Sequence, residues 1–154
     1  MSTIEESVDV QVPVRTAYNQ WTQFEEFPRF MDGVESVKQL DDKHLHWTAE
    51  LAGVRREWKA EVTEQTPDQR IAWEATEGTR HAGVVTFHRL DDGKSRVMLQ
   101  LDSQPDGVVE KAGDALGVLK RQVKGDLERF KELIESQGAE SGAWRGEVAQ
   151  HPTA

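Results

Sequence analysis

Hydrophobic and polar residues alternate along the first dozen positions of the chain. Ile4, Val8 and Val10 fall on one side of this stretch, and mostly polar residues fall on the other. A period of two places successive side chains on opposite faces of an extended chain, so the pattern predicts a half-buried β-strand. Pro13 ends the strand, because proline has no backbone N–H to give to a sheet.

Helical spacing follows the proline. Val14, Tyr18 and Trp21 recur about one turn apart, as on the face of an α-helix. The stretch FEEFPRFM, residues 24–31, then gathers four large apolar side chains within eight residues. Its proline interrupts the helix, so a second short helix or turn is predicted. So much apolar surface fits either a closed core or a lid over a ligand cavity.

Alternation returns several times between residues 33 and 101. The sides predicted to face inward include Trp47, Trp58 and Trp73, on three successive strands, and the residues DDGK at 91–94 mark a hairpin. Successive strands joined by short polar turns predict an antiparallel meander.

Apolar residues then recur every three to four positions from Val108 to Ile134, which predicts one long amphipathic helix ending at Gly138. The last residues show no apolar period and read as a flexible tail. The chain therefore divides into one domain, residues 1–137, and a C-terminal tail, residues 138–154.

The predicted fold class is α+β. An antiparallel sheet with one wet face needs a cover on its other face, and the long helix is the only large cover available. A twisted, curved sheet wrapped around one helix leaves a gap at its open end. The short helices before residue 32 are placed in sequence to roof this gap, which favours the lid.

This order of elements resembles the START-like superfamily, also called the SRPBCC or polyketide cyclase/dehydrase group, whose fold is the helix-grip. The resemblance runs from about Ile4 to about Ser136. It is carried by YNQWTQFEEFPRFMDGVESVKQLDDKHLHWTAEL, EWKAEVTEQTPDQRIAWEATEG and DLERFKELIE. It is strongest to a branch of small bacterial proteins described as cyclase/dehydrase or coenzyme-Q-binding-like. It implies a deep apolar cavity for lipids, isoprenoid quinones or polyketides. Members include enzymes, carriers and sensors, so no single chemistry is implied.

Composition narrows the classes of function. The 154 residues carry a net charge of −9 and no cysteine. The charge disfavours nucleic acid and anionic membrane surfaces as partners, and disulfides and thiolate chemistry are excluded. The sequence shows no signal-peptide pattern and no apolar run long enough for membrane insertion, so a cytoplasmic protein is expected. No cofactor is predicted, and the oligomeric state stays open.

The expected ligand is a hydrophobic small molecule, held by side chains that face inward on the strands or lie on the short and long helices. These candidates are Tyr18, Phe27, Phe30, Met31, Trp47, Arg56, Trp58, Trp73, His81, Phe87, Leu99 and Leu116. Aromatic residues commonly line such pockets, although packing in a core explains them equally well.

Arg56 shares its side of the strand with Trp58, and a buried guanidinium is costly unless it is paired. Three explanations stay open. Arg56 binds a polar group of the ligand, or pairs with the inward Glu6, or is turned outward by a bulge near Gly53.

The histidines suggest little chemistry. His81 either faces the cavity mouth as a base or hydrogen-bonding group, or sits at a strand end in water. His44 and His46 share the polar side of one strand, and a third ligand is missing, so a solvated pair is expected rather than a metal site.

The predicted function is a carrier or sensor of a hydrophobic molecule. The alternative is a polyketide cyclase or dehydratase, with Arg56, His81 and Tyr18 as suspects and its catalytic residues unknown. A module for protein interaction through the tail, around Trp144, is a third class.

Overall fold

The computed structural model describes residues 2–41, 43–51, 54–78, 80–104, 112–144 and 146. The elements follow one another as β1 (Ser2–Val10), α1 (Val14–Trp21), the 3-10 helix η1 (Phe24–Arg29), β2 (Val34–Gln39), β3 (His44–Leu51), β4 (Val54–Thr66), β5 (Arg70–Gly78), β6 (Arg80–Asp91), β7 (Lys94–Gln104) and α2 (Ala112–Gln137).

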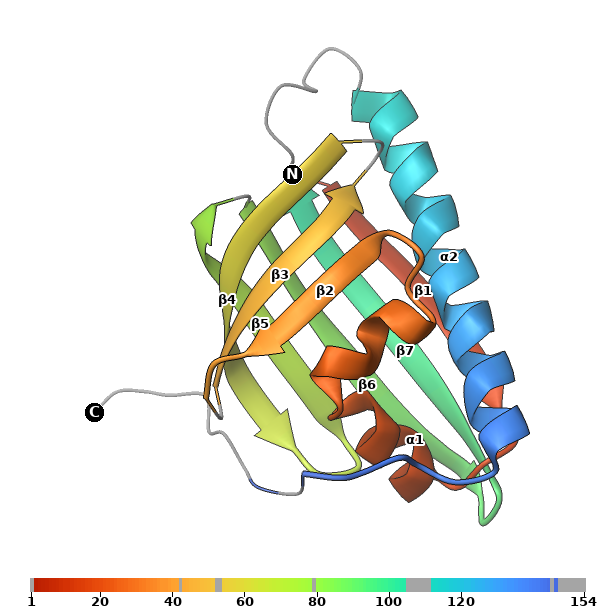
Figure 1. The fold of residues 1–154 in the computed structure, drawn as a ribbon. Coiled ribbons are helices and arrows are strands. Elements are labelled where there is room, and N and C mark those ends of the chain that lie inside the picture. Colours follow the sequence, from red (N-terminus) through yellow and green to blue (C-terminus); the bar gives the residue numbers. More distant parts are fainter. Residues whose placement is uncertain are drawn as a thin grey trace.

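All strands belong to one antiparallel sheet of seven strands in the order β1-β7-β6-β5-β4-β3-β2. β2 to β7 form a meander, and β1 returns to pair with β7, so that residues 2–10 lie against residues 95–103. The sheet curves, and α2 and the two short helices lie on its concave side (Figure 1). This arrangement confirms the predicted α+β helix-grip fold.

Irregular pairing of β4 with β5 accounts for part of the curvature. The register shifts between Lys59 and Ala60 and again between Val62 and Glu64. A bulge places an extra residue in one strand and bends it. After the second shift the alternation changes parity, so Gln65 is buried and its neighbour Glu64 is not. The alternation that the sequence shows from Val54 therefore stops at Val62, although the strand continues to Thr66.

The long helix α2 packs its apolar side into the concave face of the sheet. Among the side chains of α2 that the structure describes, the buried apolar ones follow the helical repeat and are Val123, Leu127, Phe130 and Ile134. Gly138 follows the helix with a φ of 75°, and its N–H donates to the Ile134 carbonyl at 3.0 Å. The predicted end of the helix is therefore confirmed. Residues 108–111, which the pattern also assigned to the helix, lie outside the described residues.

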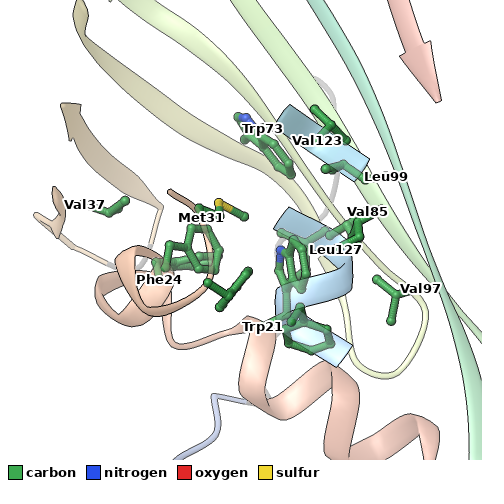
Figure 2. Close-up of a cluster of buried hydrophobic side chains, with 14 of the residues drawn as sticks. Trp21, Phe24, Met31, Val37, Trp73, Val85, Val97, Leu99, Val123 and Leu127 are labelled. Atoms are coloured by element: carbon green, nitrogen blue, oxygen red, sulfur yellow. The ribbon is translucent and has the colours of Figure 1, made fainter. Parts of the chain in front are cut away.

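An aromatic cluster joins the short helices to α2. The ring of Trp21 lies 5.0 Å from that of Phe130 and 5.5 Å from those of Phe27 and Phe30. Figure 2 shows Trp21 and Met31 within this layer, between the helices and the sheet. The apolar stretch 24–31 thus belongs to the core and also reaches the cavity described below.

The segment after α2 runs alongside α1. Hydrogen bonds hold it to the end of α1 and to η1. Asn19 Nδ2 donates to Glu140 Oε2 at 2.9 Å, the Ser141 N–H donates to Gln20 Oε1 at 2.8 Å, and the Trp144 N–H donates to Thr22 Oγ1 at 3.1 Å. Ser141 Oγ also donates to Glu26 Oε2 at 2.7 Å. The predicted flexible tail begins at residue 138, whereas residues 139–144 are held against α1. The indole of Trp144 also packs on the edge of the core.

Candidate ligand cavity

A cavity lies between the concave face of the sheet, α2 and the end of η1. It leaves about 60 Å³ for the centres of water-sized molecules and about 550 Å³ of empty space when its open mouth is included. One water needs about 10–15 Å³ by the first measure, so the cavity holds several atoms. Its walls consist of Phe27, Met31, Gly33, Val34, Trp47, Ala49, Trp58, Trp73, Leu99, Leu101, Gln122, Val123 and Asp126.

Three tryptophans from adjacent strands form the sheet side of the cavity. The ring of Trp47 on β3 stacks on that of Trp58 on β4, with centroids 5.6 Å apart and planes at 9°. Trp73 on β5 lies 6.4 Å from Trp47 at an angle of 21°. The Nε1–H of Trp47 is buried and meets no hydrogen-bond acceptor among the described residues. The sheet side of the cavity is therefore aromatic, and the buried Nε1–H of Trp47 is not exposed to the empty space.

Glycine at position 83 makes room for Trp73. The two residues face each other in the pairing of β5 with β6. A Cβ at position 83 would lie 2.5 Å from Cζ2 of Trp73 and 2.9 Å from Cδ2 of Leu101. The indole therefore lies across the bare backbone of β6, close to Leu99 and Val123 (Figure 2). Gly83 allows the third tryptophan to join the wall.

The lid side of the cavity comes from η1 and the residues after it. Phe27 and Met31 both line the space. The Phe27 ring lies 5.6 Å from that of Trp47, so it connects the lid to the aromatic wall. Part of the stretch 24–31 therefore covers a cavity, as the architecture predicted.

Gln122 on α2 lines the helix side of the cavity. Its Nε2 donates to the carbonyl of Glu50 at 3.1 Å. A Cβ on Gly33 would lie 1.7 Å from this Nε2 and 2.8 Å from the Glu50 carbonyl oxygen. Glycine at position 33 therefore lets the amide of Gln122 reach across to β3.

Asp126, one helical turn beyond Gln122, is the charged residue of the wall. Its residue surface is 9% exposed. Oδ1 accepts from Nη2 of Arg129 at 2.5 Å and from the backbone N–H of Asp32 at 3.3 Å. Burial raises the pKa of Asp126 to about 6, and the nearby Arg129 only partly counteracts this rise. The cavity thus contains a carboxyl group that titrates near neutral pH.

The sequence reading missed Asp126 although a signal was present. Asp126 lies three residues after Val123 and one before Leu127, within the apolar stripe of the helix. A charged residue on such a stripe must be buried or must bend outward, and here it is buried beside a cavity.

Six of the twelve predicted ligand-binding residues line the cavity: Phe27, Met31, Trp47, Trp58, Trp73 and Leu99. Tyr18, Phe30 and Phe87 are buried instead in the aromatic layer beside α1, where the rings of Tyr18 and Phe87 are 5.3 Å apart. The side chains of His81 and Leu116 lie outside the described residues.

Arg56 stands opposite Ala49, and the β3–β4 register runs without a shift from His44 to Leu51. The alternative that a bulge turns Arg56 outward is therefore wrong. Arg56 is half-buried and is not one of the described residues of the cavity wall. Glu6, the other suggested partner, lies 3.8 Å from the ammonium of Lys120. A role for Arg56 in anchoring a ligand stays a prediction.

The histidine pair has acidic neighbours. His44 Nδ1 lies 2.8 Å from the Asp41 carboxylate, and His46 Nε2 lies 3.4 Å from that of Glu57. In the described part of the chain, no three residues of the kinds that bind metals gather at one place. No helix in that part has the length and apolar character to cross a membrane.

A curved antiparallel sheet gripping one long helix around an apolar cavity defines a START-like protein. Residues 10–132 match the family described as polyketide cyclase / dehydrase and lipid transport. Since the match spans most of the chain, the protein belongs to this family.

Individual relatives agree with this assignment. An uncharacterised 17.2 kDa protein of Streptomyces lincolnensis is 60% identical over 149 residues, which cover 96% of this chain and 99% of the relative. Two solved structures share the fold. A START superfamily protein from Mycobacterium smegmatis is 18% identical with a TM-score of 0.65, covering 82% of this chain and 97% of that one. The Zhui aromatase/cyclase of a Streptomyces species is 15% identical with a TM-score of 0.74, covering 93% and 99%.

Proposed function

We propose that the protein binds a hydrophobic small molecule in this cavity, as a carrier or a sensor. Lipids, isoprenoid quinones and polyketide-like compounds are the candidate ligands. The observation that carries the proposal is a wall of three tryptophans facing an empty space, into which only Gln122 and Asp126 bring polar side chains from the described residues. The description of the family, which includes lipid transport, supports it.

Burial of apolar surface supplies the affinity. Each square ångström removed from water contributes about 25 cal/mol, so a ligand that buries about 300 Å² gains about 7 kcal/mol. This gain offsets association costs of several kcal/mol. Flat, conjugated molecules gain further from stacking on the paired rings of Trp47 and Trp58.

Native mass spectrometry of the purified protein, under mild and then denaturing conditions, tests for a copurified ligand. Binding is also measured by quenching of tryptophan fluorescence with a short-chain isoprenoid benzoquinone. Ala49→Leu fills the cavity and is expected to abolish quenching, whereas Ala139→Leu adds the same atoms at an exposed position and should preserve it. Equal quenching of both variants would place the ligand elsewhere.

A polyketide cyclase or dehydratase is the second candidate, and Asp126 favours it. A carboxyl with a pKa of about 6 in an apolar cavity is suited to accept and return a proton at neutral pH. The cavity would hold a flexible chain in a folded shape, which brings its reacting carbons together.

Turnover of a poly-β-keto thioester tests this second function. The variants are Asp126→Asn together with Arg56→Met, His81→Gln and Tyr18→Phe, which cover the suspects from the sequence. Cyclisation that depends on Asp126 would support an enzyme. Cyclisation at the wild-type rate in all four variants would remove their catalytic role.

We also propose that the protein acts in the cytoplasm without a nucleic-acid partner. The net charge of −9 supports the lack of a nucleic-acid partner, because it repels phosphate groups. Tight DNA or RNA binding in a mobility-shift assay at physiological salt would contradict the proposal.

A further inference from the structure

The polar groups at the cavity come from one side only, the helix α2. Gln122 and Asp126 are four residues apart, so their side chains point from the same face of the helix. The sheet and lid sides of the described wall consist of apolar, aromatic and glycine residues. A bound molecule therefore has an orientation: its apolar body faces the tryptophans and its polar end faces α2.

Both groups on α2 have already used their strongest contacts elsewhere. Nε2 of Gln122 donates to the Glu50 carbonyl, which leaves the amide oxygen Oε1 for a ligand. Both hydrogen bonds that reach Asp126 from described residues end on Oδ1, so Oδ2 remains an unused acceptor. The polar side of the cavity therefore offers two oxygen acceptors.

Arg129, the cation beside Asp126, does not add a hydrogen-bond donor to the described wall of the cavity. Nε of Arg129 donates to the carbonyl of Phe30 at 2.9 Å and lies 3.3 Å from the carboxylate of Asp32. Its guanidinium is thus fixed between α2 and the end of η1, and Arg129 is not among the described residues of the wall. No lysine or arginine appears in that described wall. An anionic group that enters the cavity therefore meets the carboxylate of Asp126, and the cation beside this carboxylate, Arg129, is already paired with it.

We propose that the cavity selects ligands whose polar end is neutral and donates a hydrogen bond, such as an alcohol, a phenol, a hydroquinone or an amide, and rejects carboxylates, sulfonates and phosphates. Asp126 is the residue that determines this specificity. The inference rests on the proposed ligand-binding function and names the chemical class of the ligand. A second negative charge beside a buried carboxylate is strongly unfavourable, whereas a neutral O–H or N–H satisfies Oδ2.

Two probes of the same shape test the inference by titration calorimetry. Naphthalene-2-sulfonamide is neutral and donates N–H groups, while naphthalene-2-sulfonate carries a permanent charge. At pH 8 we expect the wild type to bind the sulfonamide at least about tenfold more tightly. In Asp126→Asn the ratio should fall below about threefold, chiefly because the sulfonate binds better. Circular dichroism and thermal unfolding check that the variant is folded.

A pH series on the wild type gives a second readout that needs no substitution. The sulfonate keeps its charge, so its affinity should rise as the pH falls from 8 to 5 and Asp126 takes up a proton. Arg129 and Asp32 are the charged residues that contact Asp126, and Asp32 is exposed. The sulfonamide affinity should change far less.

The outcomes separate the inference from the function on which it rests. Equal binding of the two probes at pH 8, or a preference that survives in Asp126→Asn, overturns the specificity while leaving the ligand-binding function standing. If neither probe nor the benzoquinone binds the wild type, the proposed function fails and the specificity fails with it.

Discussion

Asp126 occupies a position on α2 where the helical repeat calls for a hydrophobic side chain. Its neighbours on this face, Val123 and Leu127, are buried, and Asp126 itself is 9% exposed. Burial disfavours the ionised carboxylate, and a salt bridge with Arg129 compensates only in part. The protonation of Asp126 therefore affects both the stability of the fold and the charge of the cavity wall.

The pH dependence of stability follows from this shift. The native pKa of Asp126, about 6, lies above its ordinary value of 3.8, so the folded protein holds the proton more tightly. The stabilisation from this proton is fully present below pH 4 and is lost as the pH rises through 6. Between pH 4 and 7 the free energy of unfolding of the wild type should therefore fall relative to Asp126→Asn, by about 3 kcal/mol at most. Urea titrations across this range measure the difference, and a constant difference contradicts the prediction.

Gly83 allows a second test at the scale of one residue. Gly83→Ala would push a methyl group against Trp73 and Leu101, so we expect a loss of about 1–3 kcal/mol in stability. Gly93→Ala is the control, because a Cβ there meets no atom within 4 Å. Urea unfolding of both variants measures the contrast, and equal stabilities would mean that Trp73 does not lie across β6.

Among the elements, α1 depends most on a distant part of the chain. Asn19, Gln20 and Thr22 are buried polar residues at its end. Buried polar groups are costly without hydrogen-bond partners, and residues 140–144 supply such partners. Residues 139–144 therefore help to hold α1 in place.

Two truncations measure the contribution of this segment. A chain ending at Gly138 loses the contacts with α1, while a chain ending at Trp144 keeps them. The shorter chain loses the three hydrogen bonds to the end of α1 and the bond from Ser141 Oγ to Glu26 Oε2. At about 1 kcal/mol each, partly regained from water, we expect it to be about 2 kcal/mol less stable. Thermal and urea unfolding of the two chains give the difference. Equal stability would show that α1 does not need the segment.

The sequence predicted most elements because local patterns determine them. The alternation of apolar and polar residues predicted β3 with Trp47 facing inward. The helical repeat of apolar residues, followed by Gly138, predicted the end of α2. The end of β4 was missed because a bulge reverses the alternation before Gln65. The contacts of Ser141 and Trp144 were missed because they join segments about 120 residues apart, as in the bond from Trp144 to Thr22. Asp126 was missed because a charged residue in an apolar stripe can also turn toward solvent, and the helical repeat alone does not decide between the two.

For the molecule as a whole, the main feature is that the core is incompletely filled. About 60 Å³ remains for the centres of water-sized molecules inside an otherwise buried layer of side chains. A ligand larger than a few carbons needs more room than this and would extend into the open part of the cavity. The interior thus combines tight aromatic packing at α1 with free volume near β3.

A pair of alanine-to-leucine substitutions on the sheet tests whether the space beside the cavity wall is empty. Ala49 lines the cavity, whereas Ala60 is fully buried outside its described wall. Ala49→Leu should leave the free energy of unfolding within about 1 kcal/mol of the wild type, while Ala60→Leu should cost about 1–3 kcal/mol through overpacking. Urea unfolding decides between them. A large loss for both would indicate that no usable space lies beside Ala49.

The pairing of β1 with β7 also has a consequence for biosynthesis. Residues 2–10 leave the ribosome before their partners, residues 95–103, which emerge only about 90 residues later. At about 5–20 residues per second, residues 2–10 wait for several seconds before they are paired. Its acidic side chains, Glu5, Glu6 and Asp9, keep this waiting segment hydrated and discourage pairing with strands of neighbouring nascent chains.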